Sequence, residues 1–136
     1  MKYLVDTHLL LWAAVGQTSS RKSRAGLTVE AIAVIEDLDN TLFFSAAAIW
    51  EVCIKSALGK PDFNVDANVL RRALLDNGYL ELPISSEHAA AVGGLAGHHA
   101  DPFDRIQIAQ ATVEGIVLLT DDAAIGQYAN HPVRVV

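Results

Sequence analysis

Residues 2–12, KYLVDTHLLLW, give the first indication of how this chain folds. Residues 2–5 form a short, largely apolar run that predicts a buried strand, and the apolar side chains that follow predict a helix over Thr7–Val15. Asp6 stands where the strand ends and the helix begins. An aspartate there can cap the helix, but a carboxylate beside a buried strand is costly unless something compensates its charge.

The same succession of strand and helix recurs along the chain. Further helices are predicted over residues 27–38, 45–58, 66–77, 86–92, 103–114 and 122–128, and further strands over 42–44, 79–82, 116–119 and 133–136. Strands that alternate with helices predict an α/β fold of three layers, α/β/α, with a central, mostly parallel sheet. Gly16–Gly26 is polar and rich in turn residues, so it is predicted to be a mobile loop.

The composition fits one domain. The chain has 136 residues, 51% of them hydrophobic, so residues 1–136 are predicted to share a single core. The one cysteine, Cys53, excludes an internal disulfide and is predicted to pack in that core. No apolar stretch approaches the roughly 20 residues of a membrane-spanning helix, and no secretion signal is evident, so we expect a cytoplasmic protein without membrane contact.

The formal net charge is −6. This charge argues against a protein that holds nucleic acid through an overall positive field. It does not exclude a nuclease, because carboxylates that bind metal make the metal-free chain more negative than the metal-loaded protein.

Acidic residues recur at wide intervals, in the segments LVDTH, AAAIWEVC, DPFDRIQIAQA and VLLTDD. Asp6 and the pair Asp121 and Asp122 directly follow predicted strands, so they emerge where the carboxyl ends of parallel strands meet. Glu51 and Asp104 lie in predicted helices among apolar neighbours, where a lone carboxylate is costly. Acids gathered at one edge require a cation. Mg²⁺ or Mn²⁺, which take oxygen ligands, fit better than zinc.

Four segments in this order, DTHLLLW, SAAAIWEVCIKSALGK, HHADPFDRIQIAQA and LLTDD, resemble the PIN domain of VapC-type toxins over nearly the whole chain. The resemblance implies a PIN-like three-layer fold and a hydrolase, namely a magnesium-dependent endoribonuclease that is the toxin of a type II toxin–antitoxin pair. It also implies RNA as substrate, a cognate VapB-type antitoxin, a homodimer and a location in the prokaryotic cytoplasm.

The resemblance also implies roles for single residues. The acids that it marks as catalytic and metal-binding are Asp6, Glu51, Asp104 and Asp122. Thr7 and Thr120 match hydroxyl residues that flank such a site. Asp101 belongs to the DPFDR form of the third segment, and it can reach the same site by helical spacing because it lies three residues before an acid of the site.

Three further residues near the site have two interpretations each. Adjacent carboxylates cannot easily face one ion, so either Asp121 or Asp122 is the ligand, and the family spacing favours Asp122. Lys55, four residues after Glu51, is either its ion-pair partner or a phosphate contact, and the ion pair is favoured. Arg105 is either a contact within the site or the surface partner of the acid that precedes it.

Metal-activated water is the expected nucleophile for phosphodiester hydrolysis. Two other classes of function stay open. A magnesium-binding phospho-acceptor domain also gathers aspartates at the carboxyl edge of a parallel sheet, but it needs a lysine near the end of a late strand, and no lysine follows Lys60. A catalytically silent PIN-like binding protein is the other alternative, although all four acids are present.

Overall fold

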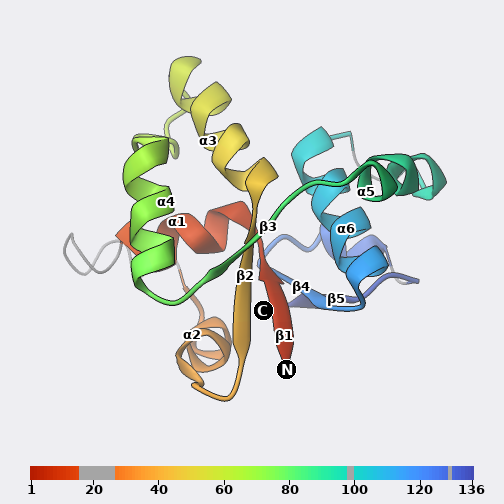
Figure 1. Cartoon of the computed structure of the whole chain (residues 1–136), viewed down its shortest axis with the longest axis horizontal. Coiled ribbons are helices and arrows are strands. Elements are labelled where there is room, and N and C mark those ends of the chain that lie inside the picture. Colours follow the sequence, from red (N-terminus) through yellow and green to blue (C-terminus); the bar gives the residue numbers. More distant parts are fainter. Residues whose placement is uncertain (16–26, 98–99, 129) are drawn as a thin grey trace.

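The computed structural model describes residues 1–15, 27–97, 100–128 and 130–136, with the backbone alone for Val15. The loop predicted at Gly16–Gly26 lies outside these residues. Within the described part, one sheet of five parallel strands has the order β3-β2-β1-β4-β5. Helices cover both faces of this sheet, as Figure 1 shows, so the predicted three-layer α/β/α architecture is confirmed.

The observed elements follow the predicted order. The strands are β1 (Lys2–Val5), β2 (Thr41–Ser45), β3 (Leu80–Leu82), β4 (Val117–Thr120) and β5 (Val133–Val135). The helices are α1 (Thr7–Val15), α2 (Val29–Glu36), α3 (Ala46–Ala57), α4 (Ala67–Asp76), α5 (Ser86–Ala91) and α6 (Pro102–Glu114). The helix predicted over residues 122–128 is wrong in kind, since only a 3-10 turn forms there, at Ile125–Gln127.

Local sequence sets the ends of the two helices that carry acids. The side chain of Ser45 caps α3 by accepting the N–H of Ala47, and Asp101 caps α6 in the same way. Pro102 stands at the start of α6, where a missing N–H costs nothing. Gly115 ends α6 with φ at 67°, a left-handed conformation that favours glycine.

Alternate side chains of the central strands enter two separate cores. Tyr3 and Val5 of β1 pack with α1, α2, α3 and α4, whereas Leu4 packs against α6. In β4, Leu119 belongs to the first core and Leu118 to the second. The central strands are therefore covered on both sides, as expected for a parallel sheet.

The connections leave β1 and β4 at the point where the strand order reverses. Helices α1 and α2 lead from β1 to β2 on one face, and α5 and α6 lead from β3 to β4 on the other (Figure 1). The carboxyl ends of β1 and β4, which are paired through Val5 and Leu119, form the crevice where such sheets bind ligands.

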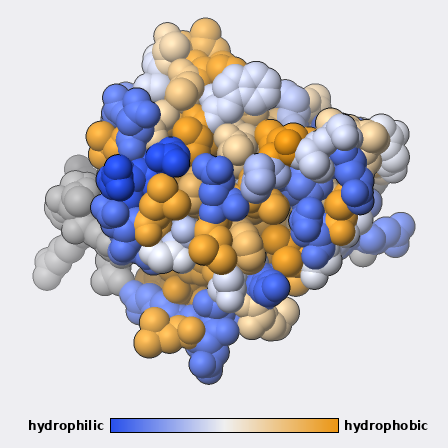
Figure 2. All heavy atoms as spheres, viewed as in Figure 1, coloured by the Kyte–Doolittle hydropathy of each residue, from blue (hydrophilic) through white to orange (hydrophobic). Residues whose placement is uncertain are grey.

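Hydrophobic and hydrophilic side chains alternate over the face in Figure 2, without one dominant apolar patch. In the part of the chain that the structure describes, no helix is long and apolar enough to cross a membrane.

Candidate active site

Asp6 is fixed between the two central strands. Its backbone N–H donates to the carbonyl of Leu119 (2.9 Å), and its own carbonyl accepts the N–H of Leu10 (3.0 Å) in the first turn of α1. The carboxyl group is buried, with 3% of the residue exposed, and its Oδ2 accepts the hydroxyl of Thr120 (2.8 Å). The ends of β1 and β4 thus hold the Asp6 carboxylate in place, so Asp6 does more than cap the helix that follows it.

Thr120 links Asp6 to the fourth acidic segment. Besides donating to Asp6, the Thr120 Oγ1 accepts the N–H of Asp122 (3.1 Å). The Asp122 Oδ1 accepts the N–H of Ala124 (2.9 Å), so this carboxylate also shapes the turn after β4. Asp121 is exposed, whereas Asp122 is half-buried. Of the two adjacent acids, Asp122 is the one that the hydrogen bonds join to Asp6.

Glu51 enters the same region from α3. It is 1% exposed, and its Oε2 accepts the ammonium of Lys55 at 2.5 Å. Its other oxygen, Oε1, is buried and has no hydrogen-bond partner in the described part of the chain. A buried carboxylate oxygen without a partner is costly, so this atom marks a place that a ligand can satisfy.

The third acidic segment contributes from the N-terminus of α6. The Asp101 Oδ1 accepts the N–H groups of Phe103 (2.8 Å) and Asp104 (3.4 Å), while its Oδ2 accepts the ammonium of Lys55 (3.2 Å). Asp104 is half-buried one turn into the helix. Asp101 is therefore both the cap of α6 and a neighbour of Glu51 through their shared Lys55.

The charges around Asp6 show how the acids converge. Burial raises the pKa of Asp6 from 3.8 to about 7, and the negative charges of Asp104 and Glu51 add to this shift. The hydrogen bond from Thr120 and the charge of His8 act in the opposite direction. The charges of Glu51 from α3 and of Asp104 from α6 thus both act on Asp6, which follows β1.

The donors in this region fit a hard divalent cation. The donors named above are carboxylate or hydroxyl oxygens, the Glu51 Oε1 lacks a partner among the described residues, and burial together with like charges raises the pKa of Asp6. Among the described residues, no group of three or more His, Cys, Asp or Glu side chains is arranged to hold a metal ion. Mg²⁺ needs no such group, because one or two carboxylates, waters and substrate phosphates commonly complete its shell.

Two buried glutamines of α6 support the site without having been predicted. Gln107 Nε2 donates to the hydroxyl of Thr7 (3.2 Å), which is buried beside Asp6. Gln110 Oε1 accepts the hydroxyl of Ser45 (2.5 Å) at the carboxyl end of β2. Their spacing contained a signal, because Gln107 and Gln110 lie three and six residues after Asp104 on a helix that is otherwise apolar on its buried face.

Of two expectations about neighbouring side chains, one is wrong and the other is confirmed. Cys53 is exposed, so its predicted place in the core is wrong. The buried side of α3 carries Ala47, Ala48, Glu51 and Val52, and a residue one position further turns to solvent. Lys55 forms the predicted ion pair with Glu51.

Arg105 contacts the turns that flank α6. Its Nη1 donates to the carbonyl of Ala96 (2.9 Å) and to the hydroxyl of Tyr128 (3.1 Å). Its Nη2 donates to the carbonyl of Val92 (3.4 Å). These contacts show that Arg105 holds together the turns that flank α6, and its predicted contact within the site stays a prediction.

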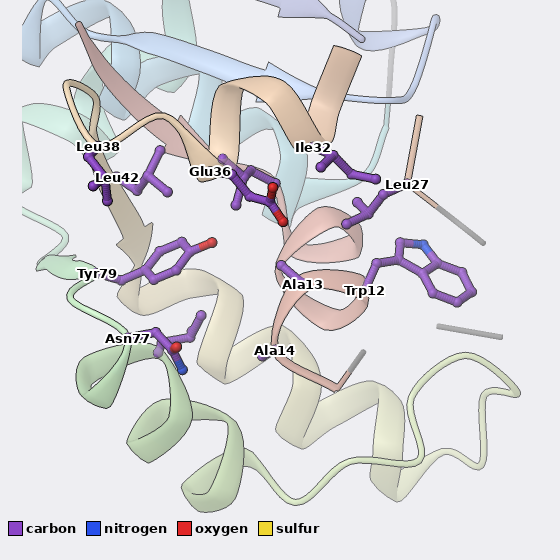
Figure 3. A pocket seen from close by; sticks show the side chains of 12 residues that line it. Trp12, Ala13, Ala14, Leu27, Ile32, Glu36, Leu38, Leu42, Asn77 and Tyr79 are labelled. Atoms are coloured by element: carbon purple, nitrogen blue, oxygen red, sulfur yellow. The ribbon is translucent and has the colours of Figure 1, made fainter. Parts of the chain in front are cut away.

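An apolar groove of about 240 Å³ lies elsewhere, between α1, α2 and the start of β3. Figure 3 shows Trp12, Leu27, Ile32, Leu42 and Tyr79 around it. None of the predicted site residues lines this groove. The Tyr79 hydroxyl has no hydrogen-bond partner in the described residues, and burial raises its pKa to about 12. The described lining contains a single carboxylate, that of Glu36, so the acids around Asp6 remain the candidate active site.

A comparison with protein-family models matches residues 3–130 to the PIN domain. This match covers almost the whole chain, including Asp6, Glu51, Asp104 and Asp122. No curated protein matches the chain in sequence.

Solved structures share the fold at low sequence identity. VapBC2 from Rickettsia felis, bound to a DNA fragment from their promoter, has a TM-score of 0.67 and 14% identity, over 99% of this chain and 98% of that one. VapBC-1 from nontypeable Haemophilus influenzae has a TM-score of 0.60 and 16% identity over the same shares. A domain of a functionally unknown protein from Methanocaldococcus jannaschii has a TM-score of 0.55 and 14% identity, over 99% and 90% of the two chains.

Proposed function

Because this chain belongs to the PIN domain family, we propose that it is a magnesium-dependent endoribonuclease of the VapC type. The observation that carries the proposal is the convergence of Asp6, Glu51 and Asp104 from three elements of the fold onto one point. The negative charges of Glu51 and Asp104 that act on Asp6, with a Glu51 Oε1 that has no partner in the described part of the chain, support a site for a divalent cation and a phosphodiester.

The residues that would hold Mg²⁺, or Mn²⁺ in its place, are Asp6, Glu51, Asp104 and Asp122, one or two of them directly and the others through water molecules. When bound, the ion would activate a water and stabilise the charge that develops on the leaving oxygen. The chain itself supplies orientation. Thr120 fixes one oxygen of Asp6, and Gln107 fixes the hydroxyl of Thr7 beside it.

The raised pKa of Asp6 gives this carboxylate a second property in the free protein. Near neutral pH it exchanges its proton readily, because burial and the charges of Asp104 and Glu51 bring its pKa to about 7. A bound cation would remove that proton by favouring the charged form. We therefore expect activity to rise with pH where binding of the cation limits the rate.

The test of this function is cleavage of a structured RNA pool by the purified full chain with Mg²⁺. We expect cleavage that EDTA abolishes and that Asp6→Asn lowers by about 100-fold or more, since a metal ion contributes several kcal/mol to such a transition state. Asp39→Asn, at an exposed acid outside the site, is the matched control and should cleave like the unchanged chain. Cleavage that survives both EDTA and Asp6→Asn would contradict the proposal. No cleavage at all would favour a PIN-like protein that only binds.

We also propose that the chain is the toxin of a toxin–antitoxin pair in the prokaryotic cytoplasm, inhibited by a VapB-type antitoxin and active as a homodimer. The fold shared with the chains of VapBC2 and VapBC-1 supports the antitoxin as partner. Co-expression with the protein encoded beside it should yield a stable complex without nuclease activity. Sedimentation of the isolated chain should give twice the mass of one chain, and a single-chain mass would refute the dimer.

A further inference from the structure

Lys55 lies inside the acidic site and bridges two of its carboxylates. Its ammonium is 2.5 Å from the Glu51 Oε2 and 3.2 Å from the Asp101 Oδ2. The Glu51 side chain is only 2% exposed and that of Lys55 21%. Helical spacing alone explains the pair with Glu51, but Asp101 comes from α6, so the cation joins α3 to the third acidic segment.

Two aromatic rings fix the position of this cation. The Lys55 Nζ lies 5.1 Å from the centroid of the Phe63 ring and 5.7 Å from that of Phe103. Both distances are within the range of a cation–π attraction. Four groups thus surround the ammonium, and a mobile surface lysine has no such set of contacts.

Lys55 brings a positive charge into the site. Its ammonium is held between the carboxylates of Glu51 and Asp101, which come from two different acidic segments of the sequence.

Because of the contact with Lys55, the two carboxylate oxygens of Glu51 have different surroundings. Oε2 is neutralised by Lys55, whereas Oε1 is buried without a partner in the described residues. The charge of Glu51 acts on Asp6, and so does the charge of Asp104. Among the described residues, the Glu51 oxygen left for a cation from solution is therefore Oε1, whereas the place between the Glu51 Oε2 and Asp101 already holds the ammonium of Lys55.

We propose that Lys55 is a built-in counter-cation that takes the position of a second divalent ion between Glu51 and Asp101, so that the site binds a single divalent ion. This inference rests on the proposed metal-dependent function. It assigns Lys55 a positioning role, because it acts through Glu51 and not on the substrate. Hydrolysis would then proceed with one divalent ion and one fixed ammonium.

The test counts Mn²⁺ bound to the metal-free full chain, by the loss of the electron paramagnetic resonance signal of free Mn²⁺ at neutral pH. We expect one equivalent for the unchanged chain and one for Lys55→Arg, which keeps the charge. Lys55→Met should bind two equivalents, and the proximity of the two ions should broaden the spectrum. Lys60→Met is the control, because Lys60 is an exposed lysine shortly after Lys55 in the sequence. It should bind one equivalent of Mn²⁺.

The outcomes distinguish a failure of the role proposed for Lys55 from a failure of the proposed metal site. Two equivalents in the unchanged chain, or one in a folded Lys55→Met, would overturn the role of Lys55 and leave the nuclease proposal intact. No bound Mn²⁺ in any protein would instead overturn the proposed metal site. Circular dichroism must show that Lys55→Met folds. If it does not, Lys55→Gln replaces it, since the amide can still donate to Glu51 without carrying a charge.

Discussion

The regions around Arg105 and around Glu51 both hold a charged group inside the fold, but they satisfy it differently. The guanidinium of Arg105 donates to carbonyls of the turn after α5 and to the hydroxyl of Tyr128. At Glu51 one oxygen is engaged by Lys55, and the other is buried without a partner among the described residues. A charge whose contacts come from the chain itself stabilises the fold, whereas a partly unsatisfied charge is stable only with a ligand.

This comparison predicts opposite effects on stability when a charge is removed from each region. At the acids, Asp6→Asn should stabilise the metal-free protein at pH 8 by about 4 kcal/mol, since each unit of pKa shift corresponds to about 1.4 kcal/mol. The pKa of Asp6 is raised from 3.8 to about 7, so the native state binds the proton more tightly than the unfolded chain. Ionisation of Asp6 therefore destabilises the native state. This loss of stability is absent below pH 3.8, grows as the pH rises, and is complete above pH 7.

Urea denaturation in EDTA at pH 4 and pH 8 measures this difference. The two proteins should have similar free energies of unfolding at pH 4, and Asp6→Asn should be the more stable at pH 8. Adding Mg²⁺ at pH 8 should stabilise the unchanged chain more than the variant. A gap that is the same at both pH values would show that the ionisation of Asp6 is not its cause.

At the other region, Arg105→Met should destabilise the protein by about 2 kcal/mol, because it removes hydrogen bonds to a charged group and leaves carbonyls unpaired. Methionine keeps the apolar part of the side chain, so the loss reports the guanidinium contacts. Thermal denaturation should detect the change, and RNA cleavage by the folded fraction should stay within about twofold of normal. A large loss of cleavage without a loss of stability would place Arg105 in the active site.

The buried amide of Gln107 should have a smaller effect on stability than either Asp6 or Arg105. Gln107→Leu removes the hydrogen bonds to Thr7 and to the carbonyl of Phe103, but it also removes the Gln107 Oε1, which has no partner among the described residues. The two effects oppose each other, so the free energy of unfolding should change by less than about 1 kcal/mol. Cleavage should nevertheless fall, because the Thr7 hydroxyl beside Asp6 loses its orientation. Equal loss of stability and activity would mean that Gln107 only supports the fold.

The sequence was sufficient for the architecture and for the acids that follow strands. β1 and α1 were predicted with their observed bounds, because an apolar run followed at once by a helix leaves few alternatives. Asp6 could be assigned to the carboxyl edge for the same reason. The roles of Lys55 towards Asp101 and of Gln107 towards Thr7 depend on contacts between segments about 46 and 100 residues apart, which no local pattern contains.

The error at Cys53 shows where the periodicity was too weak to predict a face. Apolar residues surround Cys53 on both sides in the sequence, so α3 has no clear polar stripe at that point. The structure nevertheless turns Cys53 to solvent and Glu51 inwards, against the usual preference of the two residue types. The inversion at Glu51 follows from its site, since its ion pair with Lys55 compensates the buried charge.

The smallest effect is expected at Cys53, and it tests whether α3 turns Cys53 to solvent and Glu51 inwards. Because Cys53 is exposed, its thiol should react with one equivalent of a disulfide reagent in the native protein at the rate of an accessible cysteine. Cys53→Ser should change the free energy of unfolding by less than about 0.5 kcal/mol, as for other surface substitutions. Labelling that requires denaturant, or a loss of several kcal/mol in the variant, would mean that Cys53 is buried. Glu51 could not then occupy the inward face of α3, because the two side chains lie on different sides of the helix.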